Sequence, residues 1–259
     1  RGLADEQIIG VGIDTPGIAG RDGVVRGAVN LGWEACPVQE QLKMRLQKKV
    51  CVCNDANAAA LGELWQGGGR GYRDMVMVTL GTGVGGGIII DGKVYSGFNY
   101  AAAELGHMMI VANGNPCSCG LNGCWEAYSS ATALIKSTRE AMERNPDTVM
   151  WEMCEGNLAN VNGRTAFNAM RQGDMVAAEV IDMYIEYLAV GIINIINIFC
   201  PEVLSIGGGI SNEKDRLLDM LLPRIGMRIY SSNSPRRTLI KIAELGNEAG
   251  IIGAAALRA

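Results

Sequence analysis

The sequence has few aromatic residues, a single histidine and no long block of one kind of charge. Its 259 residues include 23 Lys and Arg against 27 Asp and Glu, which gives a formal net charge of −4. A mildly acidic chain without a basic block is a poor candidate for a general binder of nucleic acid or membrane surfaces. The longest apolar stretch, residues 188–199, is interrupted by Asn194 and Asn197, and a membrane-spanning helix needs about 20 residues. We therefore expect neither a membrane partner nor a nucleic-acid partner.

Hydrophobic residues and glycine are abundant, and both point to a folded α/β chain. Hydrophobic residues make up 48% of the sequence, which excludes disorder and suffices for one large or two ordinary domains. The 35 glycines do not repeat as G-x-y, so they mark turns and close backbone approaches. Three of the 8 cysteines fall within residues 117–124 and the others are scattered through apolar runs. This pattern favours a cytoplasmic protein with one metal cluster over a disulfide-stapled secreted domain.

Short apolar segments alternate with segments of helical periodicity, which predicts an α/β fold. A hairpin arm is expected at 23–29, a hinge at 66–71, and a turn at 81–87 that leads into the strand 88–90. The expected strands are 8–14, 50–53, 74–80, 203–206 and 239–245, and the expected helices are 38–49, 56–65, 125–145, 174–199 and 249–257.

Four residues have the spacing of a metal site, H-x9-C-x-C-x4-C: His107, Cys117, Cys119 and Cys124. Thiolates and imidazole are the ligands that zinc prefers, and the glycines between them allow a tight loop. Four protein ligands leave no position for an activated water, so we expect a structural zinc ion. The alternative is three reduced cysteines in a glycine-rich loop beside an unrelated histidine. Cys51 and Cys53 alternate with valines on a strand and are expected to be core thiols.

Two glycine turns follow predicted strands, at residues 81–87 (GTGVGGG) and 207–209 (GGG). Glycines let backbone N–H groups face an anion, and Thr82 can add a hydroxyl. The first turn lacks the lysine of a P-loop, so an ordinary glycine hairpin is the alternative for it. Two such turns in one α/β chain favour a nucleotide held between them.

Three carboxylates lie where they could serve a sugar site. Asp55, at the end of a strand and the start of a helix, could accept a hydroxyl proton in phosphoryl transfer or could simply cap the helix. Glu104 and Glu126 flank the predicted metal loop, and with the amide of Asn54 they could bind vicinal hydroxyls. Each glutamate alone could equally be a solvated helix residue.

Together these segments resemble the ROK family of bacterial sugar kinases and repressors, in the actin-like ATPase superfamily. Residues 125–134 look most like the glucokinase branch. The resemblance runs the whole length and is carried by the segments 12–17 (GIDTPG), 54–63 (NDANAAALGE), 81–87, 104–107 (ELGH), 117–126 (CSCGLNGCWE), 207–209 and 247–250 (NEAG).

The resemblance implies an α/β, two-lobed, ribonuclease H-like fold with a cleft, and phosphorylation of a hexose, first of all glucose to glucose 6-phosphate. Asp55 would be the general base, and ATP, Mg²⁺ and a structural Zn²⁺ would be the cofactors. The protein would form a homodimer or higher homo-oligomer. The sugar hydroxyls would be bound by Asn30, Asn54, Glu104, His107 and Glu126, the ATP phosphates by Gly81, Thr82 and Gly83, and the adenosine would lie beside Gly207, Gly208 and Gly209.

The expected small lobe is residues 1–71 completed by 246–259, and the expected large lobe is 72–245 with the zinc loop. The sequence departs from the family in one respect. Family kinases carry an Asp-x-Gly-Gly-Thr phosphate motif several tens of residues before the Thr-Pro-Gly turn, but only 14 residues precede Thr15 and they lack it. We expect the chain to be a fragment, because its first residue is not Met. The alternatives are a truncated sugar-binding member without kinase activity and a sugar-sensing repressor, which would carry a helix-turn-helix upstream.

Overall fold

The computed structural model describes residues 4–28 and 31–257; Asn30, a predicted sugar ligand, lies outside the described residues. The strands are β1 (Gly10–Thr15), β2 (Ile18–Ala19), β3 (Val25–Ala28), β4 (Trp33–Cys36), β5 (Lys49–Asn54), β6 (Met75–Leu80), β7 (Val84–Ile90), β8 (Lys93–Val94), β9 (Val203–Gly207) and β10 (Leu239–Ile242). The α-helices are α1 (Val38–Leu46), α2 (Asp55–Gln66), α3 (Glu126–Ser129), α4 (Ala131–Arg144), α5 (Met150–Met153), α6 (Thr165–Arg171), α7 (Met175–Phe199), α8 (Asp215–Gly226) and α9 (Ala249–Ala256).

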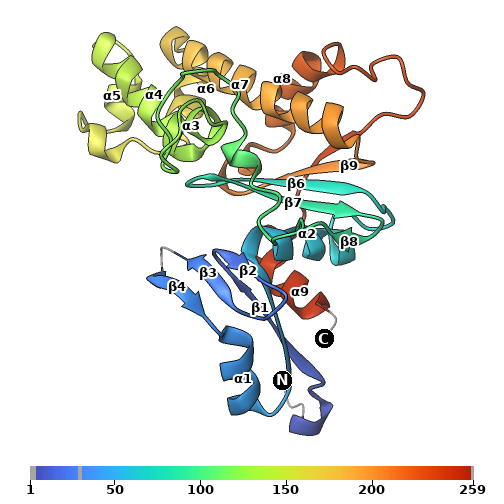
Figure 1. The fold of residues 1–259 in the computed structure, drawn as a ribbon. Helices are drawn as coiled ribbons and strands as arrows, with labels where there is room; N and C mark the ends of the chain where they lie inside the picture. Colours follow the sequence, from blue (N-terminus) through green and yellow to red (C-terminus); the bar gives the residue numbers. More distant parts are fainter. Residues whose placement is uncertain (1–3, 29–30, 258–259) are drawn as a thin grey trace.

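The largest sheet has five strands in the order β10-β9-β6-β7-β8. Strands β10, β9 and β6 are parallel, and β7 and β8 continue the sheet antiparallel. Helices cover both faces (Figure 1), with α7 and its neighbours on one side and α2 on the other. Alternate residues of β6 accordingly belong to two different cores: Val76 and Val78 pack with α7, whereas Met75 and Met77 share a smaller core with Ala60 of α2.

Two smaller sheets form the N-terminal part of the molecule. Strands β1 and β5 are parallel neighbours, and β2, β3 and β4 form an antiparallel sheet beside them. Val25, Ala28 and Val38 of this part make a third core, against which Ile13 and Val52 pack. Figure 1 shows these strands and α1 on the opposite side of α2 from the five-stranded sheet.

Helices α2 and α9 lie between the two sheet regions and pack at backbone distance. A Cβ placed on Gly253 of α9 would lie 1.7 Å from the carbonyl oxygen of Ala58, and one on Gly62 of α2 would lie 2.1 Å from that of Ala249. On its other side α2 contacts β7, where a Cβ on Gly87 would lie 2.5 Å from the Cβ of Ala60. Helix α2 is therefore fixed against both parts of the molecule.

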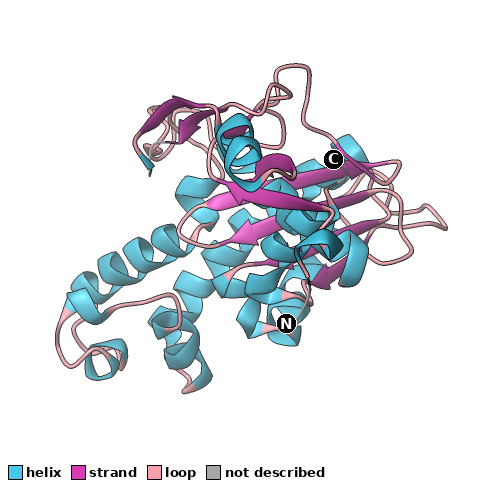
Figure 2. Cartoon of the chain, turned by 90° about the horizontal axis from the view of Figure 1, so that it is seen from below, coloured by secondary structure: helices cyan, strands magenta, loops and turns pink. Residues whose placement is uncertain are grey.

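The interleaved strands and helices predicted from the sequence are confirmed, and Figure 2 shows the strands of the sheets among the helices from a second direction. The single helix predicted over 125–145 was wrong. Ser130 adopts an extended conformation and its side chain accepts a hydrogen bond from the Ala133 N–H, so it ends α3 and caps α4.

Two other boundaries were also wrong. The turn predicted over 81–87 is confined to 81–83, and residues 84–87 already pair with β6. Glycine fits this strand because an added Cβ would clash with Thr79 at Gly85, with Leu105 at Gly86 and with α2 at Gly87. The helix predicted over 38–49 ends at Leu46, where Gln47 adopts the left-handed conformation that often closes helices, and Lys49 begins β5.

None of the helices in the two described ranges combines the length and apolar character needed to cross a membrane. The 25-residue α7 is instead a core helix, with eleven buried residues along its length.

Candidate active site and metal loop

Asp55 is the first residue of α2, at the carboxyl end of β5. The preceding Asn54 caps the helix: its Oδ1 accepts hydrogen bonds from the N–H groups of Ala56 and Asn57 at 3.0 and 3.2 Å. The Nδ2 of Asn54 donates to the carbonyl of Gly17 at 3.2 Å, which ties the cap to the Thr-Pro-Gly turn after β1. The Asp55 Oδ1 also accepts a hydrogen bond from the Ala56 N–H at 2.8 Å, and the residue is exposed at the N-terminus of the helix. The sequence alone did not decide which of these two residues caps the helix.

The four predicted metal ligands converge. One ligand atom from each of His107, Cys117, Cys119 and Cys124 lies within 4.8 Å of all the others. The Cys119 and Cys124 sulfurs are 3.7 Å apart, and the Cys117 sulfur is 3.7 Å from the His107 Nδ1. Zinc–sulfur bonds of about 2.3 Å place two sulfurs of a tetrahedron about 3.8 Å apart. The spacing and the donor chemistry therefore fit a tetrahedral zinc ion.

Backbone hydrogen bonds shape the loop that carries the cysteines. Isolated bridges join Met109 to Cys124 and Pro116 to Asn122. A Cβ on Gly123 would lie 1.7 Å from the carbonyl oxygen of Val111, and the positive φ of Gly123 (82°) is a second reason for glycine there. The tight folding of the loop brings its last cysteine back beside the first.

The thiols of the cluster differ in their environment. Burial is the main cause that raises the pKa of Cys124 to about 12, and hydrogen bonds with Cys119 and Cys117 add to the shift. The pKa of the exposed Cys119 is lowered, chiefly by a hydrogen bond from the Leu121 N–H. Since zinc binds thiolates, metal binding at this loop would release protons.

Glu126 connects the metal loop to the glycine hairpin between β6 and β7. Its Oε2 accepts a hydrogen bond from the Val84 N–H at 2.9 Å, and its Oε1 accepts one from the Ser118 hydroxyl at 3.0 Å. The Cys117 sulfur lies 3.8 Å from the same Oε1. A Cβ on Gly83 would lie 2.2 Å from Oε2, so glycine at this position makes the contact possible. Glu126 therefore has a connecting role that the sequence did not predict.

His107 and Glu104 reach the same region through the short 3-10 helix Leu105–His107, which packs on β7. A Cβ on Gly106 would lie 2.1 Å from the carbonyl oxygen of Val84, and this close contact places His107 beside the hairpin. Glu104 immediately precedes the 3-10 helix and its side chain is exposed.

The two glycine turns lie at neighbouring strand ends. Strands β6 and β9 pair in parallel, with Thr79 opposite Gly207, so both turns leave the same edge of the sheet. Gly208 has a φ of 84°, and a Cβ there would lie 2.5 Å from the Leu80 carbonyl oxygen. In α/β sheets, ligands bind at the carboxyl ends of the parallel strands.

The first glycine turn is held from behind by the start of α4. The Ala131 N–H donates to the Gly81 carbonyl at 2.8 Å, and the Thr132 hydroxyl donates to the Thr82 carbonyl at 2.7 Å. Among the described residues, the N–H groups of Thr82 and Gly83 have no protein acceptor. With its carbonyls bound on one side, the turn presents N–H groups that suit a phosphate.

Asp55 is brought close to this hairpin by the residue that follows it. A Cβ on Gly85 would lie 3.5 Å from the Ala56 Cβ, and one on Gly87 would lie 2.7 Å from the Ala56 carbonyl oxygen. The start of α2 therefore packs on the strand that leaves the first glycine turn. Asp55, the glycine turn and the Glu126 link to the metal loop form one region.

Two carboxylates were missed from the sequence. Asp14, the next-to-last residue of β1, lies opposite Cys53, and a Cβ on Gly250 of α9 would lie 2.4 Å from its Oδ2. Burial raises the pKa of Cys53 to about 12, and the charges of Asp14 and then Asp55 add to the shift. Glu63, near the end of α2, is fully buried. A polar residue at the end of a strand was a signal for Asp14, whereas only the folded contacts distinguish Glu63.

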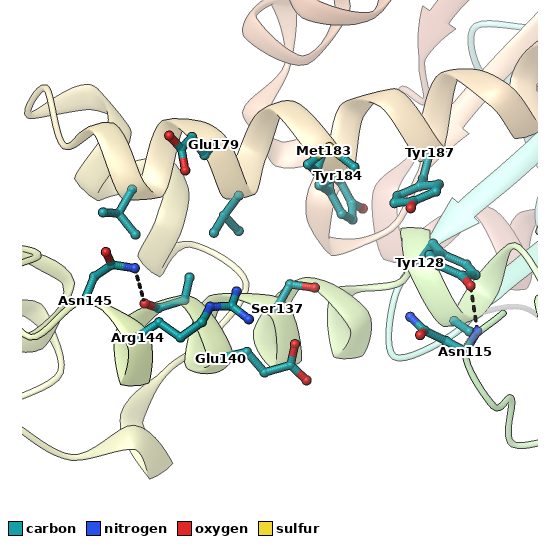
Figure 3. Close-up of a pocket in the computed structure, with 14 residues that line it drawn as sticks. Asn115, Tyr128, Ser137, Glu140, Arg144, Asn145, Glu179, Met183, Tyr184 and Tyr187 are labelled. Carbon is teal, nitrogen blue, oxygen red and sulfur yellow. Dashed lines mark hydrogen bonds between the residues drawn. The ribbon is translucent and has the colours of Figure 1, made fainter.

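Two cavities among the described residues lie outside this region. A cavity of about 480 Å³ lies between α4 and α7 (Figure 3), where Tyr128 and Tyr187 stack with ring centroids 4.5 Å apart. The Tyr128 hydroxyl accepts a hydrogen bond from the Asn115 N–H at 2.6 Å, which ties the back of the metal loop to α3. A second cavity borders β1, α2 and α9, and Asp55 lines neither.

Comparison with known proteins gives a consistent result. The ROK family model matches residues 3–259. The chain is 38% identical to a glucokinase of Thermotoga maritima over 95% of this chain and 78% of that protein. It is 30% identical to a xylose repressor of Bacillus subtilis over 95% of this chain but 60% of that protein. The solved structure of a ROK family glucokinase from Streptomyces griseus, in complex with glucose and AMPPNP, matches 96% of this chain and 81% of that chain with 33% identity and a TM-score of 0.85.

The fold and the site region therefore define a two-lobed α/β protein of the actin-like ATPase class, as the sequence predicted. The chain belongs to the ROK family.

Proposed function

We propose that the protein is an ATP-dependent hexose kinase that converts glucose to glucose 6-phosphate, with Asp55 as the general base. The observation that supports the proposal is the packing of Ala56 against Gly85 and Gly87, which brings the start of α2, where Asp55 lies, against the strand that follows the first glycine turn. Similarity to glucokinases of Thermotoga maritima and Streptomyces griseus supports glucose as the first substrate to test.

The proposed reaction needs a base on one side and phosphate donors on the other. The Asp55 carboxylate accepts the proton of a sugar hydroxyl, and that oxygen forms a bond to the γ-phosphorus of ATP as the bond to the β-phosphate oxygen breaks. Backbone N–H groups of Thr82 and Gly83 bind phosphate oxygens, and residues 207–209 lie beside the adenosine. Mg²⁺ bound to the triphosphate would neutralise part of its charge.

The metal loop has a positioning role in this proposal. A structural zinc ion would be held by His107 and the three cysteines, and it would fix His107 and, through the contacts of Glu126 with Ser118 and Cys117, Glu126 at the hairpin. His107, Glu126, Asn54 and Glu104 would bind the sugar hydroxyls, and Asn30 is proposed on sequence alone. Because Glu126 already accepts hydrogen bonds from Val84 and Ser118, a sugar hydroxyl would use a remaining lone pair.

The two lobes proposed from the sequence are residues 1–71 with 246–259, and residues 72–245. Their separate sheets and separate largest cores support this division, and a smaller core, in which Ala60 of α2 packs with Met75 and Met77 of β6, joins the two lobes. The site residues come from both lobes, so closure of the cleft would exclude water, which is chemically similar to a sugar hydroxyl.

The test is release of ADP in the presence of glucose, mannose, N-acetylglucosamine, N-acetylmannosamine or fructose. We expect turnover to be fastest with glucose and to fall by about 10²- to 10⁴-fold in Asp55→Asn, the usual contribution of a general base. Turnover with none of the sugars, or an unimpaired Asp55→Asn variant, would contradict the proposal. Calorimetry separates the kinase from a truncated, non-catalytic member, because a protein of that kind would bind glucose without binding ATP.

A sugar-sensing repressor is the second candidate, and the 30% identity to a xylose repressor favours it. Such a function needs a DNA-binding module joined to the sugar-binding module. Binding of the native protein to its own promoter DNA, released by the sugar, would favour this candidate over the kinase.

We also propose that the protein acts in the cytoplasm as a homodimer or larger homo-oligomer, on the basis of its resemblance to the family. Analytical ultracentrifugation across a range of concentrations tests the oligomeric state, and a monomer throughout would contradict it.

A further inference from the structure

Among the described residues, two segments connect the N-terminal sheets and α9 to the five-stranded sheet. Residues 67–74 lead from α2 to β6, and residues 243–248 lead from β10 to α9. Both segments are bonded to one side chain. The Glu63 Oε2 accepts a hydrogen bond from the Gly68 N–H at 3.0 Å, and its Oε1 accepts one from the Leu245 N–H at 2.7 Å. A single carboxylate therefore joins the two connections, which are about 180 residues apart in sequence.

The surroundings of Glu63 are built for a carboxylate. The residue is 0% exposed, and burial of a carboxylate is costly unless hydrogen bonds compensate it. A Cβ on Gly67 would lie 2.2 Å from Oε2, so only glycine lets the first connection wrap closely around the acid. From β10, the Lys241 ammonium donates to the Gly68 carbonyl at 3.3 Å and lies 5.7 Å from the centre of the Tyr72 ring.

Helix α2 links this junction to the site. Glu63 follows Asp55 by eight residues on the same helix, a distance of about 12 Å along its axis. Between them, α2 is held at backbone distance by Gly253 of α9 and by Gly87 of β7. Asp55 and Glu63 therefore belong to one firmly packed element, and a change in how the carboxyl end of α2 is held would alter how its first turn meets β7.

We propose that Glu63 is a positioning residue: by bonding both connections it sets the angle between the two parts of the molecule, and so the placement of Asp55 opposite the first glycine turn. The role of Asp55 in this proposal rests on the proposed function. The joining of the two connections by Glu63 rests only on its two hydrogen bonds. Glu63 does not line the site and makes no contact with Asp55 in the described part of the chain.

Kinetics of Glu63→Gln give the first test. The amide keeps the shape but replaces one accepting oxygen by an NH₂ group, which faces a backbone N–H and cannot accept from it. We expect kcat for glucose to fall at least tenfold while KM for glucose stays within threefold, because transfer geometry is lost and sugar binding is kept. The matched control is Gln66→Ala, an exposed position in the last turn of α2, which should leave both constants unchanged. An unchanged kcat, or a loss confined to KM, would overturn the proposal.

Hydrogen exchange gives a second test that does not need kinase activity. In the parent protein the Gly68 and Leu245 amides should share one level of protection. In Glu63→Gln, exchange should rise at least tenfold in both connections together and stay unchanged in β6 and β9. If exchange rose in one connection only, or rose uniformly over the whole chain, the proposal that Glu63 joins the two connections would be contradicted. If the parent turned over no hexose, the proposed function would fail while this measurement still decided whether Glu63 joins the connections.

Discussion

A Cβ added to Gly83 would lie 2.2 Å from the Glu126 carboxylate, so a side chain fits there only if Glu126 moves away. We predict that Gly83→Ala displaces Glu126 from the Val84 N–H and costs about 1–3 kcal/mol of unfolding free energy, as overpacking usually does. Gly81, two residues earlier in the same turn, has nothing within 4 Å of an added Cβ, so Gly81→Ala should be neutral or mildly stabilising. Urea unfolding of the two variants checks this, and equal effects would contradict the predicted contact.

At this scale the sequence predicted residue types better than residue partners. The metal ligands were predictable because three cysteines and a histidine at this close spacing are typical of a metal site, and the structure brings them together. The bond from Glu126 to Val84 joins residues 42 positions apart, and the capping role of Asn54 depends on the entry angle of α2. Neither can be deduced from the spacing of residue types.

The metal loop is an element whose order we expect to depend on a bound zinc ion. We predict about one zinc per chain in the purified protein and a loss of most of it in Cys119→Ser, since tetrahedral structural sites need all four ligands. The segment between Met108 and Trp125 should then become sensitive to protease, because much of it is exposed and little of it is buried in the core. The control is Cys200→Ser, an exposed cysteine outside the cluster. Elemental analysis that finds no zinc in the parent would contradict the prediction.

Helix α7 begins at a carboxylate that bonds two segments. Asp174 accepts hydrogen bonds from the Ala177 N–H, the Thr148 hydroxyl and the Val149 N–H. Burial raises the pKa of Asp174, but these hydrogen bonds outweigh it and hold the pKa below its ordinary value. A carboxylate with a depressed pKa in the folded state stabilises the fold above its unfolded pKa of about 3.9, and this contribution is lost as the pH falls through the lower folded pKa.

We therefore predict that Asp174→Ala costs about 1–2 kcal/mol at pH 7, the usual range for loss of an N-cap together with its partners. The difference from the parent should shrink as the pH falls below about 4. Asp174→Asn keeps the cap on the Ala177 N–H, but its NH₂ group would face the Val149 N–H and cannot accept from it, so the variant should recover only part of the stability at pH 7 and should lose the pH dependence. Urea unfolding between pH 2 and pH 7 measures all three proteins, and a pH-independent difference for Asp174→Ala would contradict the assignment.

Among the elements, the long amphipathic or uniformly apolar segments were predicted correctly. The points at which one helix ends and the next begins within such a segment were not. Helix α7 begins after Asp174 and ends at Phe199 as its pattern predicted. The division between α3 and α4 at Ser130 was missed, because a serine cap inside a periodic segment looks like any other polar residue until the backbone conformation is known.

For the whole molecule, the sequence predicted the α/β class and the order of elements but not their neighbours in space. Strands β6 and β9 pair although more than a hundred residues separate them, and this pairing sets the two glycine turns side by side. Likewise, the small residues of α2 and α9 are needed because each helix meets the other at backbone distance. Such requirements arise from tertiary packing and are absent from local periodicity.

This arrangement predicts a change of shape on binding substrates. Asp55 enters the site from α2, the glycine turns enter from the five-stranded sheet, and residues 67–74 and 243–248 are the described connections between the two sheet regions. If sugar and nucleotide bridge the two sides, their binding favours the closed arrangement by the difference in affinity for the two states. We expect small-angle X-ray scattering to give a smaller radius of gyration with glucose and AMPPNP together than with either alone or with neither. AMPPNP is not hydrolysed, so no mixture of substrate-bound and product-bound protein forms during the measurement. The samples with one ligand show whether binding alone changes the radius or whether both ligands are needed. An unchanged radius in all four samples would mean that the two parts form one rigid body, and water would then have to be excluded by the side chains around Asp55 rather than by closure.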